Sequence, residues 1–107
     1  MILLAVALAA ATPAPVVVSA LESEQLARAC QGKDRDPRPN FCTGYILGVF
    51  DALSLTHEIC PAPAKASTGE AIAAVRKALR SRPETWISAP SFIVRDALQK
   101  AFPCKRR

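Results

Sequence analysis

The most regular hydrophobic pattern in the chain runs from Phe41 to Leu53 and has the period of an α-helix. It predicts a central helix that begins after Asn40, whose side chain can cap it, and runs to about Glu58, ahead of Pro61. The apolar stripe of this helix consists of Cys42, Tyr45, Ile46, Val49 and Leu53.

A strip of small residues, Gly44, Gly48 and Ala52, lies beside that stripe. Because a glycine inside a helix costs about 1 kcal/mol relative to alanine, we expect another helix backbone to approach closely along the strip. A membrane dimerisation face is disfavoured, since Asp51 and His57 interrupt the apolar run. Asp51 itself is expected to form a buried hydrogen bond or ion pair, with a direct contact to a partner as the alternative.

Three further segments have helical periodicity. Residues 21–30 predict a short helix, Ser67-Thr68-Gly69-Glu70 is a capping box that opens another, and a last helix opens near Ser88 or Pro90. Pro83 ends the helix that the capping box opens. Its later turns are crowded with cations that suit the helix dipole: Arg76, Lys77, Arg80 and Arg82. The inward positions of these last two helices are Ile72, Val75, Leu79, Val94, Ala97, Leu98, Ala101 and Phe102.

No segment alternates strictly between apolar and polar residues, as a half-buried strand would. The connections are short and rich in proline, which favours antiparallel neighbours. The fold class predicted is therefore all-α, a small antiparallel helical bundle of about four helices.

Residues 1–20 have the pattern of a secretory signal peptide. Residues 2–11 are apolar and uncharged, and Val18-Ser19-Ala20 has the small-x-small form of a cleavage site, although the positively charged leader is missing apart from the terminal amine. The apolar run is shorter than the roughly 20 residues that span a bilayer, so no stable membrane anchor is expected after cleavage. Residues 21–107 then form a single domain, expected in the periplasm.

Four cysteines, Cys30, Cys42, Cys60 and Cys104, predict two disulfides in an exported domain of this size. A zinc site is disfavoured, because no cysteines have C-x-x-C spacing and the chain has one histidine. Pairing Cys42 with Cys60 would join the two ends of one helix, about 25 Å apart. We favour Cys30–Cys42 with Cys60–Cys104, and keep Cys30–Cys60 with Cys42–Cys104 as the alternative.

Several short motifs carry a resemblance to a known family. They are Cys42-x-Gly44-Tyr45-Ile46-x-Gly48-Val49-x-Asp51, Ile59-Cys60-Pro61, the Arg82-Pro83-Glu84 turn, and Ala97-Leu98-x-x-Ala101-Phe102-Pro103-Cys104. In order, spacing and cysteine frame, the chain resembles the Rap/Tai family of periplasmic immunity proteins. The resemblance implies an exported, disulfide-bonded, often dimeric protein that protects bacteria from peptidoglycan amidase effectors of type VI secretion. Members commonly have histidine where this chain has Arg82.

The resemblance implies a binding protein, and the residues themselves show no catalytic apparatus, so no enzyme is expected. His57 lies beside Glu58 near a helix end, where a surface role is favoured over general base chemistry, and paired cysteines leave no thiol nucleophile. No cofactor motif is present. The formal net charge of +5 suits an acidic partner surface, but dispersed basic residues without interleaved aromatics argue against nucleic acid.

The segment between the last two helices is the predicted partner-binding site, through Arg82, Glu84 and Trp86. Tryptophan and arginine are common anchors of interfaces, and a loop stiffened by Pro83 loses little entropy on binding. In the alternative, Trp86 folds back as a lid over the end of the bundle. A different function class, a small envelope-stress protein of the acid-chaperone kind without a toxin partner, would need a pH switch for which the chain offers few groups.

Overall fold

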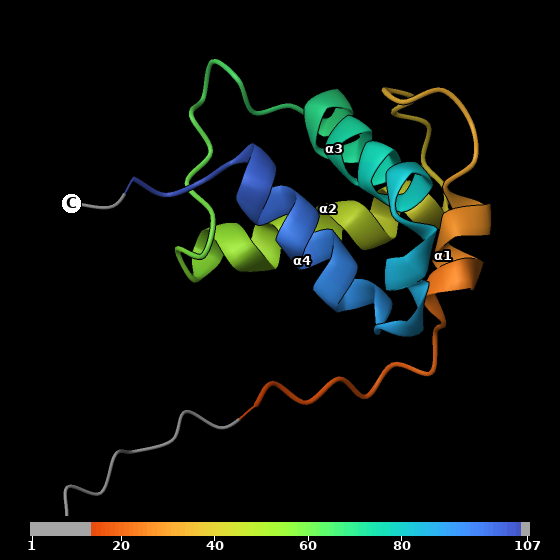
Figure 1. Ribbon diagram of the computed structural model, residues 1–107. Coiled ribbons are helices and arrows are strands. Elements are labelled where there is room, and N and C mark those ends of the chain that lie inside the picture. The colour runs from red at the N-terminus through yellow and green to blue at the C-terminus, as the bar shows by residue number, and fades with distance from the viewer. Residues whose placement is uncertain (1–13, 106–107) are drawn as a thin grey trace, which may run out of the picture.

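The computed structural model describes residues 14–105, and all regular structure within them is helical (Figure 1). This confirms the predicted all-α fold. The elements are α1 (Ser23–Ala29), α2 (Phe41–Leu55), α3 (Thr68–Ser81), the 3-10 helix η1 (Pro83–Ile87) and α4 (Pro90–Ala101).

Helices α2, α3 and α4 pack against one another, and α1 contacts all three from one end of the bundle (Figure 1). One hydrophobic core lies between them, and each helix contributes at least one fully buried side chain to it. The largest of these are Leu26, Ile46, Ile72, Val75, Val94 and Leu98, joined by Ile59 from the loop after α2.

Two disulfides join the ends of the helices. Cys30, which follows α1, is bonded to Cys42 in the first turn of α2, and Cys60 is bonded to Cys104 near the C-terminus. This is the favoured pairing from the sequence, and the alternative pairing is wrong. The loops that the two bridges close span 12 and 44 residues. Bridges of this kind stabilise a small domain by restricting the unfolded chain.

Helix α2 begins where the sequence predicts and ends earlier. The Asn40 side chain accepts a hydrogen bond from the Thr43 amide at 2.9 Å, which is the expected cap. At the other end the predicted boundary near Glu58 is wrong, because the helix closes at Leu55 with a Schellman motif. In it the Glu58 amide donates to the Leu53 carbonyl at 2.9 Å, and His57 takes the left-handed conformation with φ 58°.

The small-residue strip of α2 does not contact another helix of residues 14–105. Gly44, Gly48 and Ala52 are exposed, and a Cβ atom added at either glycine would meet nothing within 4 Å. The expected close packing of another helix of this bundle along the strip is therefore wrong. Asp51 is exposed on the same side, so its expected burial is also wrong. The physical reason is that α2 is apolar on more than one side, and its core is built on the face that carries Cys42, Ile46 and Leu53.

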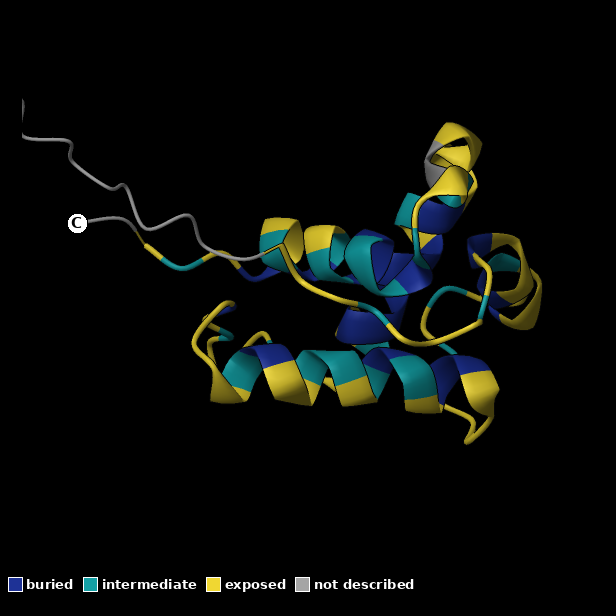
Figure 2. Ribbon diagram, turned by 90° about the horizontal axis from the view of Figure 1, so that it is seen from below, coloured by how far each residue is buried: buried dark blue, intermediate teal, exposed yellow. Residues whose placement is uncertain are grey.

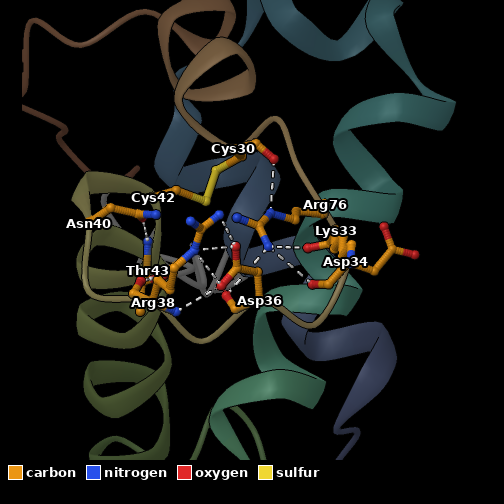
Figure 3. Close-up of a disulfide and its surroundings, with 9 residues drawn as sticks. All are labelled: Cys30, Lys33, Asp34, Asp36, Arg38, Asn40, Cys42, Thr43 and Arg76. Atoms are coloured by element: carbon orange, nitrogen blue, oxygen red, sulfur yellow. Dashed lines mark hydrogen bonds and ion pairs between the residues drawn. A yellow bond between two sulfur atoms is a disulfide. The ribbon is translucent and has the colours of Figure 1, made fainter.

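Arg76 is a buried charge at the centre of the loop between α1 and α2. It is 2% exposed, a burial that its prediction as one of the cations suiting the dipole of this helix did not include. Figure 3 shows the guanidinium pointing into the loop beside the Cys30–Cys42 bridge. Its Nε donates to the Cys30 carbonyl at 2.8 Å, and Nη1 donates to the Lys33 carbonyl. The backbone carbonyls of an irregular loop need such donors, because the loop has no regular pattern of backbone hydrogen bonds.

Two carboxylates of the same loop are held by arginines. The Arg80 guanidinium hydrogen-bonds to Asp34 and holds the pKa of that carboxyl below its usual value. The side chain and backbone of Arg38 hydrogen-bond to Asp36, with Nε to Oδ2 at 2.8 Å, and lower the pKa of that group in the same way. Arg76 adds a smaller electrostatic effect of the same sign on both. The loop therefore carries negative charge beside a buried positive one.

The predicted signal peptide lies largely outside the described residues. Residues 14–22 form no helix, and Val16 and Val18 are exposed. None of the helices described between residues 14 and 105 is long and apolar enough to cross a membrane.

We expect replacement of Arg76 to destabilise the fold far more than replacement of its exposed neighbour Arg80. Lysine at position 76 keeps a charge but lacks the fork of donors, so buried carbonyls lose partners. Arg76→Lys should lower the free energy of unfolding by about 2–4 kcal/mol, and Arg80→Lys by less than about 1 kcal/mol. Denaturant unfolding of both variants measures this, and equal effects would contradict the role given to Arg76.

Stability should also fall in acid because of Asp34 and Asp36. Their pKa values are lower in the folded state than the ordinary value of 3.8, so the native state binds fewer protons than the unfolded state. This contribution is present above about pH 4 and is lost as the pH falls through the folded pKa values. The double variant Asp34→Asn/Asp36→Asn should show a flatter melting temperature between about pH 5 and pH 2 than the wild type, and high salt should reduce the difference. Parallel profiles would contradict the assignment.

Candidate functional site

The connection between α3 and α4, residues 82–89, is anchored to the bundle by Trp86. The indole Nε1 donates to the Leu79 carbonyl near the end of α3 at 3.0 Å, and the ring packs against the core. This satisfies a carbonyl that the end of the helix leaves without an intrahelical partner. Of the two arrangements predicted for Trp86, the structure shows the lid and not a projecting side chain.

The far end of the connection is held by α1 and α4. The buried hydroxyl of Ser23 donates to the Ser88 carbonyl, which ties the start of α1 to this segment. Pro90 then occupies the first turn of α4, where it needs no hydrogen-bond partner for its nitrogen, and its ring is buried. Contacts of η1 with α1, α3 and α4 complete the support. The connection is thus fixed at both ends, although most of its length is irregular or 3-10 helical.

The outer side of the connection presents three exposed side chains of different chemistry. Arg82 and Glu84 are exposed, as a partner-binding role requires, and Ile87 is 96% exposed. Sequence reasoning selected Trp86 as the apolar anchor and missed Ile87. No sequence signal separates these neighbours, because a 3-10 helix turns by about 120° per residue and its register decides which side chain faces inward. The large apolar side chain that faces solvent here is therefore Ile87.

A groove between α3 and α4 leads away from Arg82. It has a volume of about 470 Å³, and its lining is built largely of small and apolar side chains. Lys77, Arg82 and Lys100 line it together with a single carboxylate, that of Asp96, which also pairs with Arg95 at 3.2 Å. The groove and the exposed connection form one continuous surface through Arg82, and cations outnumber anions on it.

All four cysteines are in disulfides, and His57 lies exposed in the turn after α2. Between residues 14 and 105, no three His, Cys, Asp or Glu side chains gather where they could hold a metal ion.

Comparison with known proteins identifies the family. The sequence model of the family described as Rap1a immunity proteins matches residues 22–104, which includes every described helix and all four cysteines. The chain belongs to this family of Rap1a immunity proteins. Searches of curated proteins and of solved structures found no match. Membership of the Rap1a family confirms the resemblance drawn from the cysteine frame and the Arg82-Pro83-Glu84 turn, and makes this an immunity protein for a secreted effector.

We expect Trp86 to contribute more to the stability of this Rap1a family member than to contacts with a partner protein. Trp86→Ala removes a half-buried ring and a hydrogen bond, so the free energy of unfolding should fall by about 2–4 kcal/mol. Trp86→Phe keeps most of the ring contact and should cost about 1 kcal/mol. Because Trp86 is the only tryptophan in the sequence, its replacement removes the tryptophan fluorescence. Unfolding should therefore be followed by circular dichroism. An unchanged melting temperature for Trp86→Ala would place the indole in solvent.

Proposed function

We propose that this protein is an exported, non-enzymatic inhibitor that protects its cell from a peptidoglycan amidase effector of type VI secretion. The observation that carries the proposal is membership of the Rap1a immunity family over residues 22–104. Two disulfides support export, since such bonds form and persist in oxidising compartments such as the periplasm. The apolar run at residues 2–11 and the small-x-small pattern ending at Ala20 are the proposed signal peptide.

The surface proposed to meet the effector is the α3–α4 connection, with Arg82, Glu84 and Ile87 as its contacts. A hydrolase acting on a polymer has an open cleft, and a rigid projecting segment can occupy it and exclude the substrate. Because the connection is already held by Trp86 and Ser23, little conformational entropy is lost on binding. The net charge of +5 favours encounter with an acidic effector surface. The proposed assembly also includes association of two copies of the immunity protein.

Periplasmic co-expression with candidate type VI amidases tests the proposal, with lysis as the readout. Wild type should prevent lysis by one of them, and the purified pair should block peptidoglycan hydrolysis. The double variant Arg82→Ala/Ile87→Ala should weaken binding by about 30-fold or more, because truncating interface anchors commonly costs 2 kcal/mol or more. Its melting temperature should stay close to wild type, since both side chains are exposed.

Lys65→Ala is the matched control, an exposed cation in the loop before α3 and therefore about 20 Å along the helix from Arg82. It should bind as wild type does. Full protection by Arg82→Ala/Ile87→Ala would show that the effector contacts another surface. Failure of the wild type to protect against any amidase tested would contradict the amidase assignment.

A further inference from the structure

The groove between α3 and α4 is built from the same five-residue pattern on both of its walls. Helix α3 carries Ala74-Val75-Arg76-Lys77-Ala78, and helix α4 carries Ala97-Leu98-Gln99-Lys100-Ala101. In each pattern the two alanines are four residues apart, so they lie on one face of the helix, with the lysine beside them. All four alanines and both lysines line the groove. Each wall therefore presents two methyl groups and one cation.

The two patterns face each other because α4 runs back along α3 (Figure 1). Each helix turns its buried side toward the centre of the bundle (Figure 2), and Val75 and Leu98, the second residues of the two patterns, are fully buried. The short alanine side chains leave the space above the seam between the helices unfilled, which gives the groove its volume of about 470 Å³. Phe92 and Ile93 add apolar surface from the first turn of α4. The floor of the groove is therefore apolar, and its volume lies within the roughly 300–1,000 Å³ of ligand sites.

The groove continues toward the start of α3. A neighbouring cavity of about 630 Å³ shares Ala74, Lys77 and Ala101 with it and reaches the loop before α3. From Ser67 at this end to Arg82 at the other, α3 spans about 22 Å at 1.5 Å per residue. An extended chain rises about 3.3 Å per residue, so the whole groove has room for a segment of six or seven residues.

Charge along the groove selects the chemistry of such a segment. Lys65, Lys77 and Lys100 line the two cavities, are exposed, and form no salt bridge within residues 14–105. Two carboxylates also line the groove, and each is already paired with an arginine outside the lining: Glu70 with Arg35 at 2.8 Å and Asp96 with Arg95 at 3.2 Å. The unpaired charges of the groove are therefore positive.

We propose that this groove binds an acidic, aliphatic segment of the effector in extended form. One carboxylate of the segment lies between Lys77 and Lys100, and its aliphatic side chains cover the alanine floor. A small anion would pair with the lysines but would leave the apolar floor uncovered, which favours a peptide. The groove meets the α3–α4 connection at Arg82, so a segment bound in it continues the proposed effector surface. The inference rests on the proposed function for the identity of the partner alone.

Titration of the isotope-labelled protein, purified from the periplasm, with a synthetic peptide tests the groove without any effector. The probe is acetyl-Ala-Leu-Glu-Leu-Ala-amide, followed by two-dimensional NMR. Amide signals of residues 74–78 and 97–101 should shift and saturate with a dissociation constant of about 1 mM, as expected of a short peptide in an open groove. The matched peptide with glutamine in place of glutamate should bind about fivefold more weakly, because it cannot pair with the lysines.

Two variants separate the charge of the groove from its shape. Lys77→Gln/Lys100→Gln should weaken binding of the acidic peptide about fivefold and leave binding of the glutamine peptide unchanged. Ala101→Leu should weaken both peptides, since leucine fills the point where the two cavities meet without changing the charge. All three positions are exposed, and glutamine and leucine are good helix formers, so both variants should keep the fold.

The matched control is Arg28→Gln/Lys33→Gln. It removes the same charge from exposed positions outside the groove and should bind the acidic peptide as wild type does.

Three results would overturn the groove as a peptide site. The first is the absence of shifts in α3 and α4 up to about 10 mM peptide. The second is an equal loss of affinity in the control, which would show general attraction to a cationic protein. The third is equal affinity for acetate, phosphate or octanoate, which would make the groove a site for small anions or lipids.

None of these results depends on an effector, so the groove can fail while the amidase proposal, read from lysis, stands. In the lysis assay Lys77→Gln/Lys100→Gln should protect less well than wild type. Full protection by this variant, together with peptide binding in the groove of the wild type, would overturn the assignment of the segment to the effector.

Discussion

The arrangement of this bundle depends on one buried guanidinium. Arg76 of α3 donates to carbonyls of the loop that follows α1, and the Cys30–Cys42 disulfide ties the same loop to α2. Removing a cation from water is costly. The Arg76 guanidinium is stable in the interior because several carbonyls accept its hydrogen bonds and carboxylates lie nearby. This contact sets the position of α1. Helix α1 in turn holds the α3–α4 connection through Ser23 and Ser88, so an interaction at the core also positions the proposed binding surface.

The α3–α4 connection divides stability and recognition between neighbouring residues. Trp86 faces the bundle and satisfies a carbonyl of α3, whereas Ile87, the next residue, is almost fully exposed. Burial of Trp86 keeps Ile87 in place without restricting which partner groups Ile87 can contact. A surface built in this way can vary its exposed side chains to suit different effectors while its support stays the same.

Helix α2 has one buried and one exposed side. Cys42, Ile46 and Leu53 build the core, whereas Gly44, Gly48 and Ala52 are exposed. Glycine at positions 44 and 48 lowers the stability of the isolated helix, by about 1 kcal/mol each relative to alanine. No other residue of the described chain occupies the space above them.

Much of the fold could be predicted from the sequence because the signals are local. The caps at Asn40 and Ser67 act within three residues, as their bonds to Thr43 and Glu70 show, and the helices they open follow from periodicity. The disulfide pairing followed as well, since helix length excludes Cys42–Cys60 and antiparallel neighbours favour the observed bridges. Where each side chain points was decided by tertiary structure.

A helix that is apolar on two sides does not reveal in its sequence which side the core covers, so the Gly44–Gly48–Ala52 strip was placed wrongly. A cation on α3 is buried only where a loop from elsewhere supplies carbonyls, which no local pattern around Arg76 encodes. Whether Trp86 or Ile87 faces the bundle depends on the register of η1 against α3, which is set by tertiary packing. Local hydrogen bonds and periodicity are thus determined by the sequence itself, whereas exposure is determined by which elements meet.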